Sequence, residues 1–264
     1  MDWSQKVAIV TGGSRGIGKA YAEALHAAGA KVAVADLDRD QANAVGEACG
    51  GFGARVDVSN EGQVAAFITE TEKRLGPVDI YVSNAGIGSS DGPLFGAASA
   101  PNTAWEDSWQ VNVMGSVYAA RHVIPGMVSR GGGSFVIVAS AAGLLAQLGC
   151  APYTVTKHAA VAFAESLAVA HGDEGIKVAC ACPQAVNTRM IEGAKDSLLA
   201  VGGVVEPETV AQLTLKSLDE GKFFVFPHEE VADYIQGKAA EPDRWLGGMR
   251  KLRRGLVEKN GRPL

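Results

Sequence analysis

Short apolar runs rich in β-branched residues alternate with longer segments of helical pattern, and this alternation constrains the fold more than any other feature. The expected strands are Lys6–Thr11, Lys31–Ala35, Gly53–Val56, Val78–Ser83, Ser134–Ala139, Ile176–Ala181 and Phe223–Phe226. The expected helices cover about 16–28, 39–48, 60–75, 103–128, 152–173 and 206–219. Uninterrupted apolar runs suit strands buried on both faces, and strand–helix alternation implies right-handed crossovers. The pattern predicts an α/β fold with a doubly wound parallel sheet of about seven strands and helices on both faces.

The chain is long and apolar enough to build one large core. It has 264 residues, of which 47% are hydrophobic and 20% charged. This composition excludes a disordered chain, and the length excludes a disulfide-stapled miniprotein. Because no internal repeat or low-complexity linker divides the sequence, we expect residues 1–264 to form a single domain.

The charge is acidic overall but basic at the end of the chain. The net charge of −5 gives no general attraction to nucleic acid or to an anionic membrane. The extension at about 238–264 instead carries eight Lys or Arg residues against three acidic ones. We interpret it as a solvated terminal helix or a subunit contact, and we do not expect nucleic acid as a partner.

The cysteines and the N-terminal sequence indicate the cellular compartment in which the protein is expected. The four cysteines form no C-x-x-C pair, so we interpret them as small core residues in a reducing environment; they are Cys49, Cys150, Cys180 and Cys182. The start of the chain carries Asp2 and a four-residue apolar run, unlike a signal peptide. No 18-residue apolar stretch occurs. A cytoplasmic protein without a membrane partner is expected.

A glycine-rich loop follows the first expected strand and opens the first expected helix. It reads TGGSRGIG at residues 11–18. Glycines permit a tight turn and let backbone N–H groups approach a pyrophosphate, which the helix N-terminus also attracts. The expected cofactor contacts here are Gly12, Ser14, Arg15, Gly16, Ile17 and Gly18.

Asp36 ends the second expected strand, 18 residues beyond Gly18. An acid at this distance accepts hydrogen bonds from the ribose hydroxyls of the cofactor and repels a 2′-phosphate. Leu37 follows it where a basic residue would favour NADP. Arg15 favours NADP, but a carboxylate beside a phosphate is costly, so we expect NAD rather than NADP. The alternative for Asp36 is a helix N-cap.

Further motifs occur in a characteristic order, and together they resemble the short-chain dehydrogenase/reductase family from end to end. They are Asp57-Val58, Asn84-Ala85-Gly86, Asn112, Ser140, Tyr153-x-x-x-Lys157 and PQAVNT at 183–188. The resemblance implies a Rossmann-type fold and assembly as a homotetramer or dimer. It also implies cofactor contacts at Asp57, Val58, Asn84, Gly86, Pro183, Val186 and Thr188.

Tyr153 and Lys157 are expected to share one face of a helix, one turn apart. A free Tyr has a pKa near 10, too high for a base at neutral pH. A nearby ammonium favours the phenolate and lowers the Tyr pKa. Tyr153 would then act as general base for alcohol oxidation or general acid for carbonyl reduction. The alternatives are an exposed Tyr and a solvated Lys on that helix.

The resemblance implies roles for two further residues. Ser140, at the end of the fifth expected strand, would hydrogen-bond the substrate oxygen; a turn cap is the alternative. Asn112 would hold a water that links Lys157 to solvent, and the alternative is a satisfied contact between helices. Lys157 would also bind the nicotinamide ribose. One departure occurs where the family usually has Gly after Pro183, since this chain has Gln184.

The sequence disfavours two other kinds of site. The five histidines are scattered, with no H-x-x-x-H spacing and no carboxylate partner at ligand spacing, so no metal site is expected. Ser140 lies in VASAAG rather than in G-x-S-x-G, which disfavours a nucleophilic hydrolase.

Three segments are expected to line the substrate pocket: Ile87–Thr103, Ala141–Ala151 and Gln184–Val205. Their apolar members favour a hydrophobic secondary alcohol or ketone; these are Leu94, Phe95, Leu144, Leu145, Leu148, Met190, Leu198 and Leu199. The substrate loop at about 185–205 is interpreted as a lid.

The expected helix at 152–173 carries small or apolar residues on nearly every face. One face can cover the sheet, and the other predicts a partner helix from another subunit.

The expected activity is NAD-dependent hydride transfer between the nicotinamide and a secondary alcohol or ketone. One alternative is an NADPH-dependent ketone or 3-oxoacyl reductase. Another is a catalytically silent dinucleotide sensor or scaffold, which the combination of Asn112, Ser140, Tyr153 and Lys157 disfavours.

Overall fold

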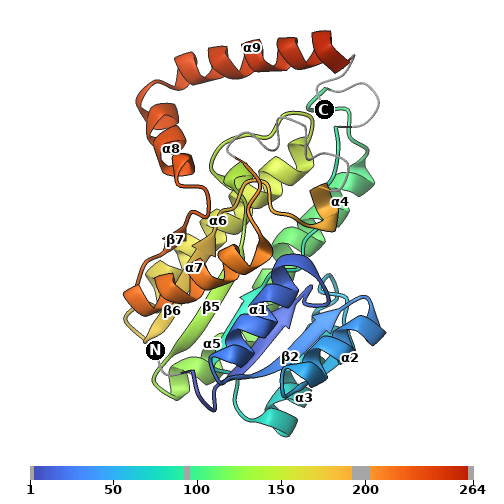
Figure 1. Cartoon of the computed structure of the whole chain (residues 1–264), viewed down its shortest axis with the longest axis vertical. Coiled ribbons are helices and arrows are strands. Elements are labelled where there is room, and N and C mark those ends of the chain that lie inside the picture. Colours follow the sequence, from blue (N-terminus) through green and yellow to red (C-terminus); the bar gives the residue numbers. More distant parts are fainter. Residues whose placement is uncertain (1–2, 92–95, 192–202, 261–264) are drawn as a thin grey trace.

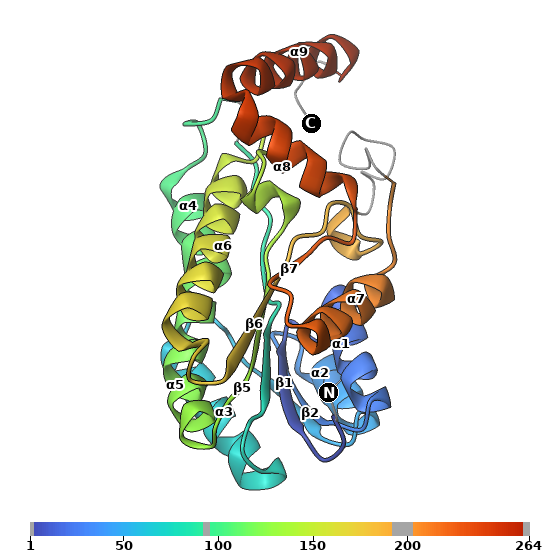
Figure 2. The same cartoon turned by 90° about the vertical axis from the view of Figure 1, so that its left-hand side faces the viewer.

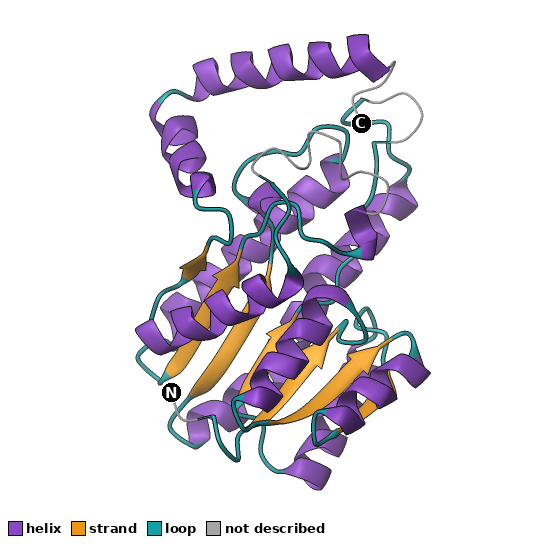
Figure 3. Ribbon diagram, in the orientation of Figure 1, coloured by secondary structure: helices purple, strands orange, loops and turns teal. Residues whose placement is uncertain are grey.

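A seven-stranded parallel sheet with the order β3-β2-β1-β4-β5-β6-β7 forms the centre of the protein (Figures 1 and 3). The computed structural model describes residues 3–91, 96–191 and 203–260. The strands are β1 (Val7–Thr11), β2 (Lys31–Asp36), β3 (Phe52–Arg55), β4 (Ile80–Ser83), β5 (Gly133–Val138), β6 (Ile176–Ala181) and β7 (Phe224–Val225). The expected doubly wound Rossmann-type fold is confirmed.

Helices cover both faces of the sheet (Figure 2). Helices α1 (Gly16–Ala27), α2 (Arg39–Ala48) and α7 (Pro207–Glu220) pack on one face, where Tyr21, Leu25 and Val210 join the core. Helices α3 (Glu61–Leu75), α5 (Gly115–Ser129) and α6 (Ala151–His171) cover the other, where Phe67 and Met127 are buried. The central strands are buried on both sides, which explains their uninterrupted apolar runs.

The chain reverses its winding direction between β1 and β4. Strand β1 pairs in parallel with β2 on one side and with β4 on the other. In open α/β sheets, ligands bind at such a switch point, beyond the carboxyl ends of the strands. The loops after β1 and β4 therefore position the site described below.

The helix expected at 103–128 contains a π-helical turn. The structure has α4 (Asn102–Trp109), a π-helical turn η1 (Gln110–Met114) and then α5. The three segments follow one another without a break over 102–129, so the expected helix is confirmed, but its π-helical turn was not predicted because hydrophobic periodicity does not reveal one extra residue in a turn. Two helices follow β7: α8 (Glu230–Ala240), which was not predicted, and α9 (Pro242–Asn260), which lies in the segment interpreted as a terminal helix.

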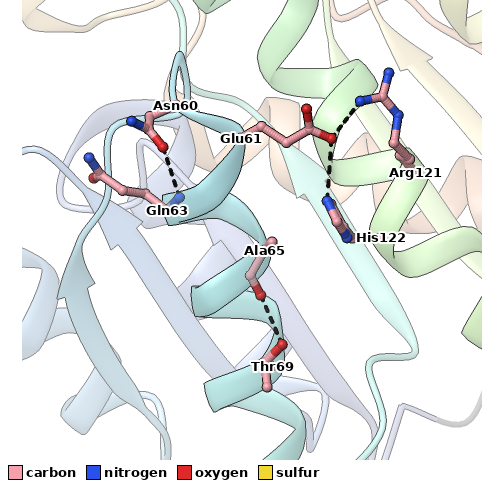
Figure 4. Close-up of polar contacts among 7 residues, drawn as sticks. All are labelled: Asn60, Glu61, Gln63, Ala65, Thr69, Arg121 and His122. Carbon is pink, nitrogen blue, oxygen red and sulfur yellow. Dashed lines mark hydrogen bonds and ion pairs between the residues drawn. The ribbon is translucent and has the colours of Figure 1, made fainter.

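Helix α3 begins as its sequence indicates (Figure 4). The Asn60 side chain accepts a hydrogen bond from the backbone N–H of Gln63 at 3.1 Å, which confirms Asn60 as the N-cap. Glu61 then joins α3 to α5 through Arg121 and through His122, whose Nε2 lies 3.4 Å from the Glu61 carboxylate. These contacts join α3 and α5 where both helices pack on the same face of the sheet.

All four cysteines are free thiols. Cys180 and Cys182 are buried at the end of β6, with their sulfur atoms 3.8 Å apart. Within the part of the chain that the structure describes, no helix combines the length and the apolar character that a membrane crossing requires.

Candidate active site

A cavity of about 1270 Å³ lies beyond the carboxyl ends of the central strands. All but one of the predicted cofactor residues line it: Gly12, Arg15, Gly16, Ile17, Gly18, Asp36, Asp57, Val58, Asn84, Gly86, Tyr153, Lys157, Pro183, Val186 and Thr188. Ser14 is absent from the lining, because its side chain is 4% exposed and turned toward Asp36. The sequence motifs therefore converge on one space.

The glycine-rich loop fits a pyrophosphate group. Gly12 and Gly16 have φ angles of 61° and 52°, which side chains rarely adopt. A Cβ on Gly18 would clash with the carbonyl oxygen of Gly12, so the close turn requires glycine there. Helix α1 begins with no side-chain cap and no acid in its first turn, unlike α2, which Asp38 caps. The first N–H groups of α1 are thus available to an anion at the cavity wall.

Asp36 lies at the edge of the same cavity and is 9% exposed. Its Oδ2 accepts hydrogen bonds from the backbone N–H and the hydroxyl of Ser14 at 3.1 and 2.7 Å. Its Oδ1 accepts one from the backbone N–H of Asp38 at 3.1 Å. These bonds fix the carboxylate, and Asp38, rather than Asp36, caps the following helix.

Asn84 ties the loop after β4 to the loop after β1. Its Nδ2 donates to the carbonyl oxygens of Thr11 and Gly12 at 2.9 and 3.0 Å. The Thr11 hydroxyl accepts from the backbone N–H groups of Asn84 and Ala85 at 3.0 and 3.1 Å. The Asn84 side chain thus holds the glycine-rich loop in position, and Asn84 also lines the cavity where it is predicted to contact the cofactor.

Ser140 and Tyr153 line both this cavity and a second one described below. Ser140 follows β5, and its Oγ accepts a hydrogen bond from the backbone N–H of Ala142 at 3.1 Å. Ser140 thereby caps the short 3-10 turn η2 (Ala141–Gly143), the alternative role considered for it. The hydroxyl donates to the Pro183 carbonyl oxygen at 3.4 Å, and it lies close enough to Tyr153 to influence the Tyr153 pKa as a hydrogen-bonding group.

The electrostatics of Tyr153 differ from the expectation. Burial raises the pKa of Tyr153 above its ordinary value, and the hydrogen bond with Ser140 opposes this shift. Lys157 lies near the ring, with its Nζ 5.7 Å from the Tyr153 ring centroid, but burial is the largest influence on the Tyr153 pKa, and the shift is upward rather than downward as expected. The Lys157 ammonium donates to the Val138 carbonyl oxygen at 2.9 Å, and burial lowers the pKa of Lys157 from 10.5 to about 8.

Asn112 lies in the π-helical turn and faces the loop after β4. Its Oδ1 accepts from the backbone N–H of Ile87 at 2.8 Å. Its Nδ2 donates to the Ile87 carbonyl oxygen at 3.0 Å and to the Thr156 hydroxyl at 3.1 Å. Asn112 is thus a buried contact between helices and a loop, and its partner Thr156 lies between Tyr153 and Lys157 on α6.

Gln184 lines both cavities where the family usually has Gly. Its backbone N–H donates to Nδ1 of His228 at 3.2 Å. His228 is 3% exposed and precedes α8. The segment after β6 is therefore anchored to the start of α8, a contact that the sequence did not reveal because the two residues are 44 positions apart.

The second cavity, of about 900 Å³, opens from Ser140 and Tyr153 toward α8 and α9. Leu145, Leu148 and Met190 line it, as expected. Leu144 is not among its lining residues, while Leu94, Phe95, Leu198, Leu199 and most of the expected lid lie outside the described residues.

Helices α8 and α9 extend over the carboxyl edge of the sheet and supply the far wall (Figure 2). Residues of α9 at spacings of four, three and four line the cavity: Trp245, Met249, Leu252 and Leu256. Sequence analysis missed these residues, although their spacing defines one helix face. The basic extension is therefore part of the second cavity and not a fully solvated helix.

The family model described as short chain dehydrogenase matches residues 6–198. The chain belongs to this family. It is an oxidoreductase that acts on alcohols, and the family binds a nicotinamide dinucleotide.

Among the described residues, no group of three or more His, Cys, Asp or Glu side chains could hold a metal ion.

Curated relatives include several alcohol dehydrogenases. The chain is 35% identical over 237 residues to 2,5-dichloro-2,5-cyclohexadiene-1,4-diol dehydrogenase of Sphingobium indicum, covering 85% of this chain and 94% of the relative. It is 33% identical to (+)-borneol dehydrogenase 1 of Salvia officinalis, covering 88% and 90%. It is 32% identical to 2-(R)-hydroxypropyl-CoM dehydrogenase of Xanthobacter autotrophicus, covering 90% and 97%.

A solved structure has the same architecture. It is a short chain dehydrogenase/reductase from Burkholderia phymatum in complex with NAD, with a TM-score of 0.79 and 25% identity. The match covers 100% of this chain and 98% of that one.

Proposed function

We propose that the protein is an NAD-dependent dehydrogenase that oxidises a secondary alcohol on a mainly apolar substrate, or reduces the matching ketone. The observation that carries the proposal is the position of Ser140 and Tyr153 in the lining of both cavities. A substrate in the smaller cavity would reach the same hydroxyls as a cofactor in the larger one. The nicotinamide, when bound, accepts a hydride from the carbinol carbon or returns it to a ketone.

Tyr153 is the proposed general acid/base. In the oxidation its phenolate takes the proton of the substrate hydroxyl, while Ser140 donates a hydrogen bond to the substrate oxygen. Burial makes the phenolate costly, so Lys157 and the charge of the oxidised cofactor must supply its stabilisation. Asn112 ties Ile87, in the loop after β4, to Thr156, which precedes Lys157 on α6.

Asp36 supports NAD as the cofactor. Its carboxylate is fixed by Ser14 and Asp38 at the cavity edge, where a 2′-phosphate would meet a buried negative charge. Arg15 lines the same cavity and supports the alternative, an NADPH-dependent reductase.

We also infer a homo-oligomer, a tetramer or a dimer, that uses the face of α4 and α6. Trp109, Val155 and Val169 are 43%, 47% and 88% exposed there, an apolar surface that a second copy would cover. Light scattering tests this directly, because a monomeric mass at micromolar concentration contradicts it.

The test of the activity is a screen of apolar secondary alcohols with NAD and NADP, followed by absorbance of the reduced cofactor. We expect turnover with NAD that exceeds turnover with NADP. Cofactor binding without any reduction across the panel would contradict the proposal and support a silent sensor. Faster turnover with NADP would support the reductase.

A further inference from the structure

The second cavity is apolar near Ser140 and Tyr153 but carries charged side chains where α8 meets α9. These side chains are Asp233, Lys238, Glu241 and Arg244. Glu241 and Arg244 pair with each other at 3.0 Å and neutralise one another. Asp233 is exposed, and it lies about 140° around α8 from Lys238, since each residue of a helix advances by about 100°. Lys238 is thus a cation on the cavity wall that needs separate explanation.

Lys238 is only partly satisfied by the protein. Its Nζ donates one hydrogen bond, to the carbonyl oxygen of Leu144 at 2.7 Å, and lies 5.0 Å from the centroid of the Trp245 ring. No described carboxylate lies within 4.0 Å of it. An ammonium has three donors, so donors remain for a ligand in the cavity. Desolvation lowers the pKa of Lys238, as expected for a cation that has lost water without gaining a counter-ion.

We propose that Lys238 is an anion-binding residue of the substrate cavity, and that the substrate is an amphiphilic hydroxy acid whose carboxylate binds Lys238 while its secondary alcohol lies at Ser140 and Tyr153. This deepens the proposed function and rests on it. The cavity lining also includes Leu145, Leu148 and Met249, apolar side chains that suit a hydrocarbon body. The Trp245 ring lies beside the ammonium, with its centroid 5.0 Å from Nζ, and a charge-assisted hydrogen bond from Lys238 to a carboxylate is stronger than one between neutral groups.

The Lys238–Leu144 hydrogen bond also allows a purely structural role. Leu144 follows the turn that Ser140 caps, so Lys238 could serve only to tie α8 to the Ser140 loop. Loss of such a tie would affect every substrate in the same way. Loss of an anion site would affect only charged substrates, and this difference allows a decisive test.

The first experiment measures binding and does not depend on turnover. Decanoate and decanol, equal in chain length, are titrated by calorimetry into the wild-type protein and the Lys238→Met variant, each saturated with NAD. We expect decanoate to bind the wild type at least about tenfold more tightly than decanol, as a hydrogen bond to a charged group implies. The preference should disappear in Lys238→Met and persist in Lys238→Arg. Lys216→Met, on the exposed face of α7, is the matched control and should retain it.

The second experiment compares secondary hydroxy carboxylates of increasing chain length with their methyl esters as substrates. Lys238→Met should lower kcat/KM for the preferred acid by about tenfold or more, mainly through KM, and leave the ester nearly unchanged. Equal losses for acid and ester, or equal binding of decanoate and decanol by the wild type, would overturn the proposal. Failure of the proposed function looks different, because no acid, ester or simple alcohol would then reduce NAD, whatever the calorimetry shows.

Discussion

Lys157 allows a quantitative test of the electrostatics, through the replacement Lys157→Met. The side chain is 5% exposed, and its ammonium donates to one carbonyl oxygen, that of Val138. Because burial lowers the Lys157 pKa from 10.5 to about 8, the folded state releases this proton at a lower pH than the unfolded state. Methionine has similar length and no charge, so it removes this titration and little volume.

The magnitude follows from proton linkage. A shift of this size makes the charged form cost roughly 3 kcal/mol on folding, a cost fully present below about pH 8. As pH rises from about 8 toward 10.5, the folded protein loses the proton first and the cost is relieved. Between about pH 7 and about pH 9.5, Lys157 should therefore raise the free energy of unfolding by about 2 kcal/mol.

The assay is urea unfolding of the cofactor-free wild type and of Lys157→Met at both pH values. All other titrating groups contribute equally to both proteins, so the difference between their unfolding free energies isolates Lys157. We expect the wild type to gain about 2 kcal/mol relative to the variant at the higher pH. A difference that does not change with pH, or one that changes in the opposite direction, would refute the desolvated ammonium.

Three further outcomes follow from the site. Tyr153→Phe should lower kcat about a hundredfold or more because the acid/base group is lost, while the Kd of NADH, measured by fluorescence, stays within about twofold; unchanged kcat would contradict the assignment. Asp36→Ala should shift the kcat/KM preference toward NADP. It should also reduce the free energy of unfolding by about 1–3 kcal/mol, since the N–H groups of Ser14 and Asp38 lose their acceptor. An unchanged cofactor preference in steady-state assays would contradict the role given to Asp36. Gly18→Ala should abolish NAD binding in calorimetry, because its Cβ would clash with Gly12, whereas Gly247→Ala, with open space around it, should bind normally.

Much of the sheet could be predicted because local patterns determine it. Apolar runs identify the strands, and β6 has the expected bounds at Ile176–Ala181. Asn60 identifies the start of α3 because a side-chain cap acts within three residues. The glycine-rich loop, Ser140 and Tyr153 were predicted by motif spacing, and the topology brings them to one edge of the sheet.

The features that sequence analysis missed depend on distant contacts. The pair Gln184 and His228 carries no local signal, since 44 residues separate a backbone donor from its imidazole acceptor. The direction of the Tyr153 pKa shift depends on burial, which a four-residue spacing cannot show. The role of Trp245 in the cavity wall was hidden because the basic residues around it suggested a solvated segment.

The division of the two cavities between different parts of the chain has an evolutionary consequence. The dinucleotide side is built by segments up to Ile191, whereas the far wall of the second cavity comes from α8 and α9. Mutation or recombination confined to residues 230–260 would leave the hydride-transfer residues untouched while it reshapes what the enzyme accepts. Homologous enzymes can thus change their substrate specificity in this region while they keep the same catalytic residues.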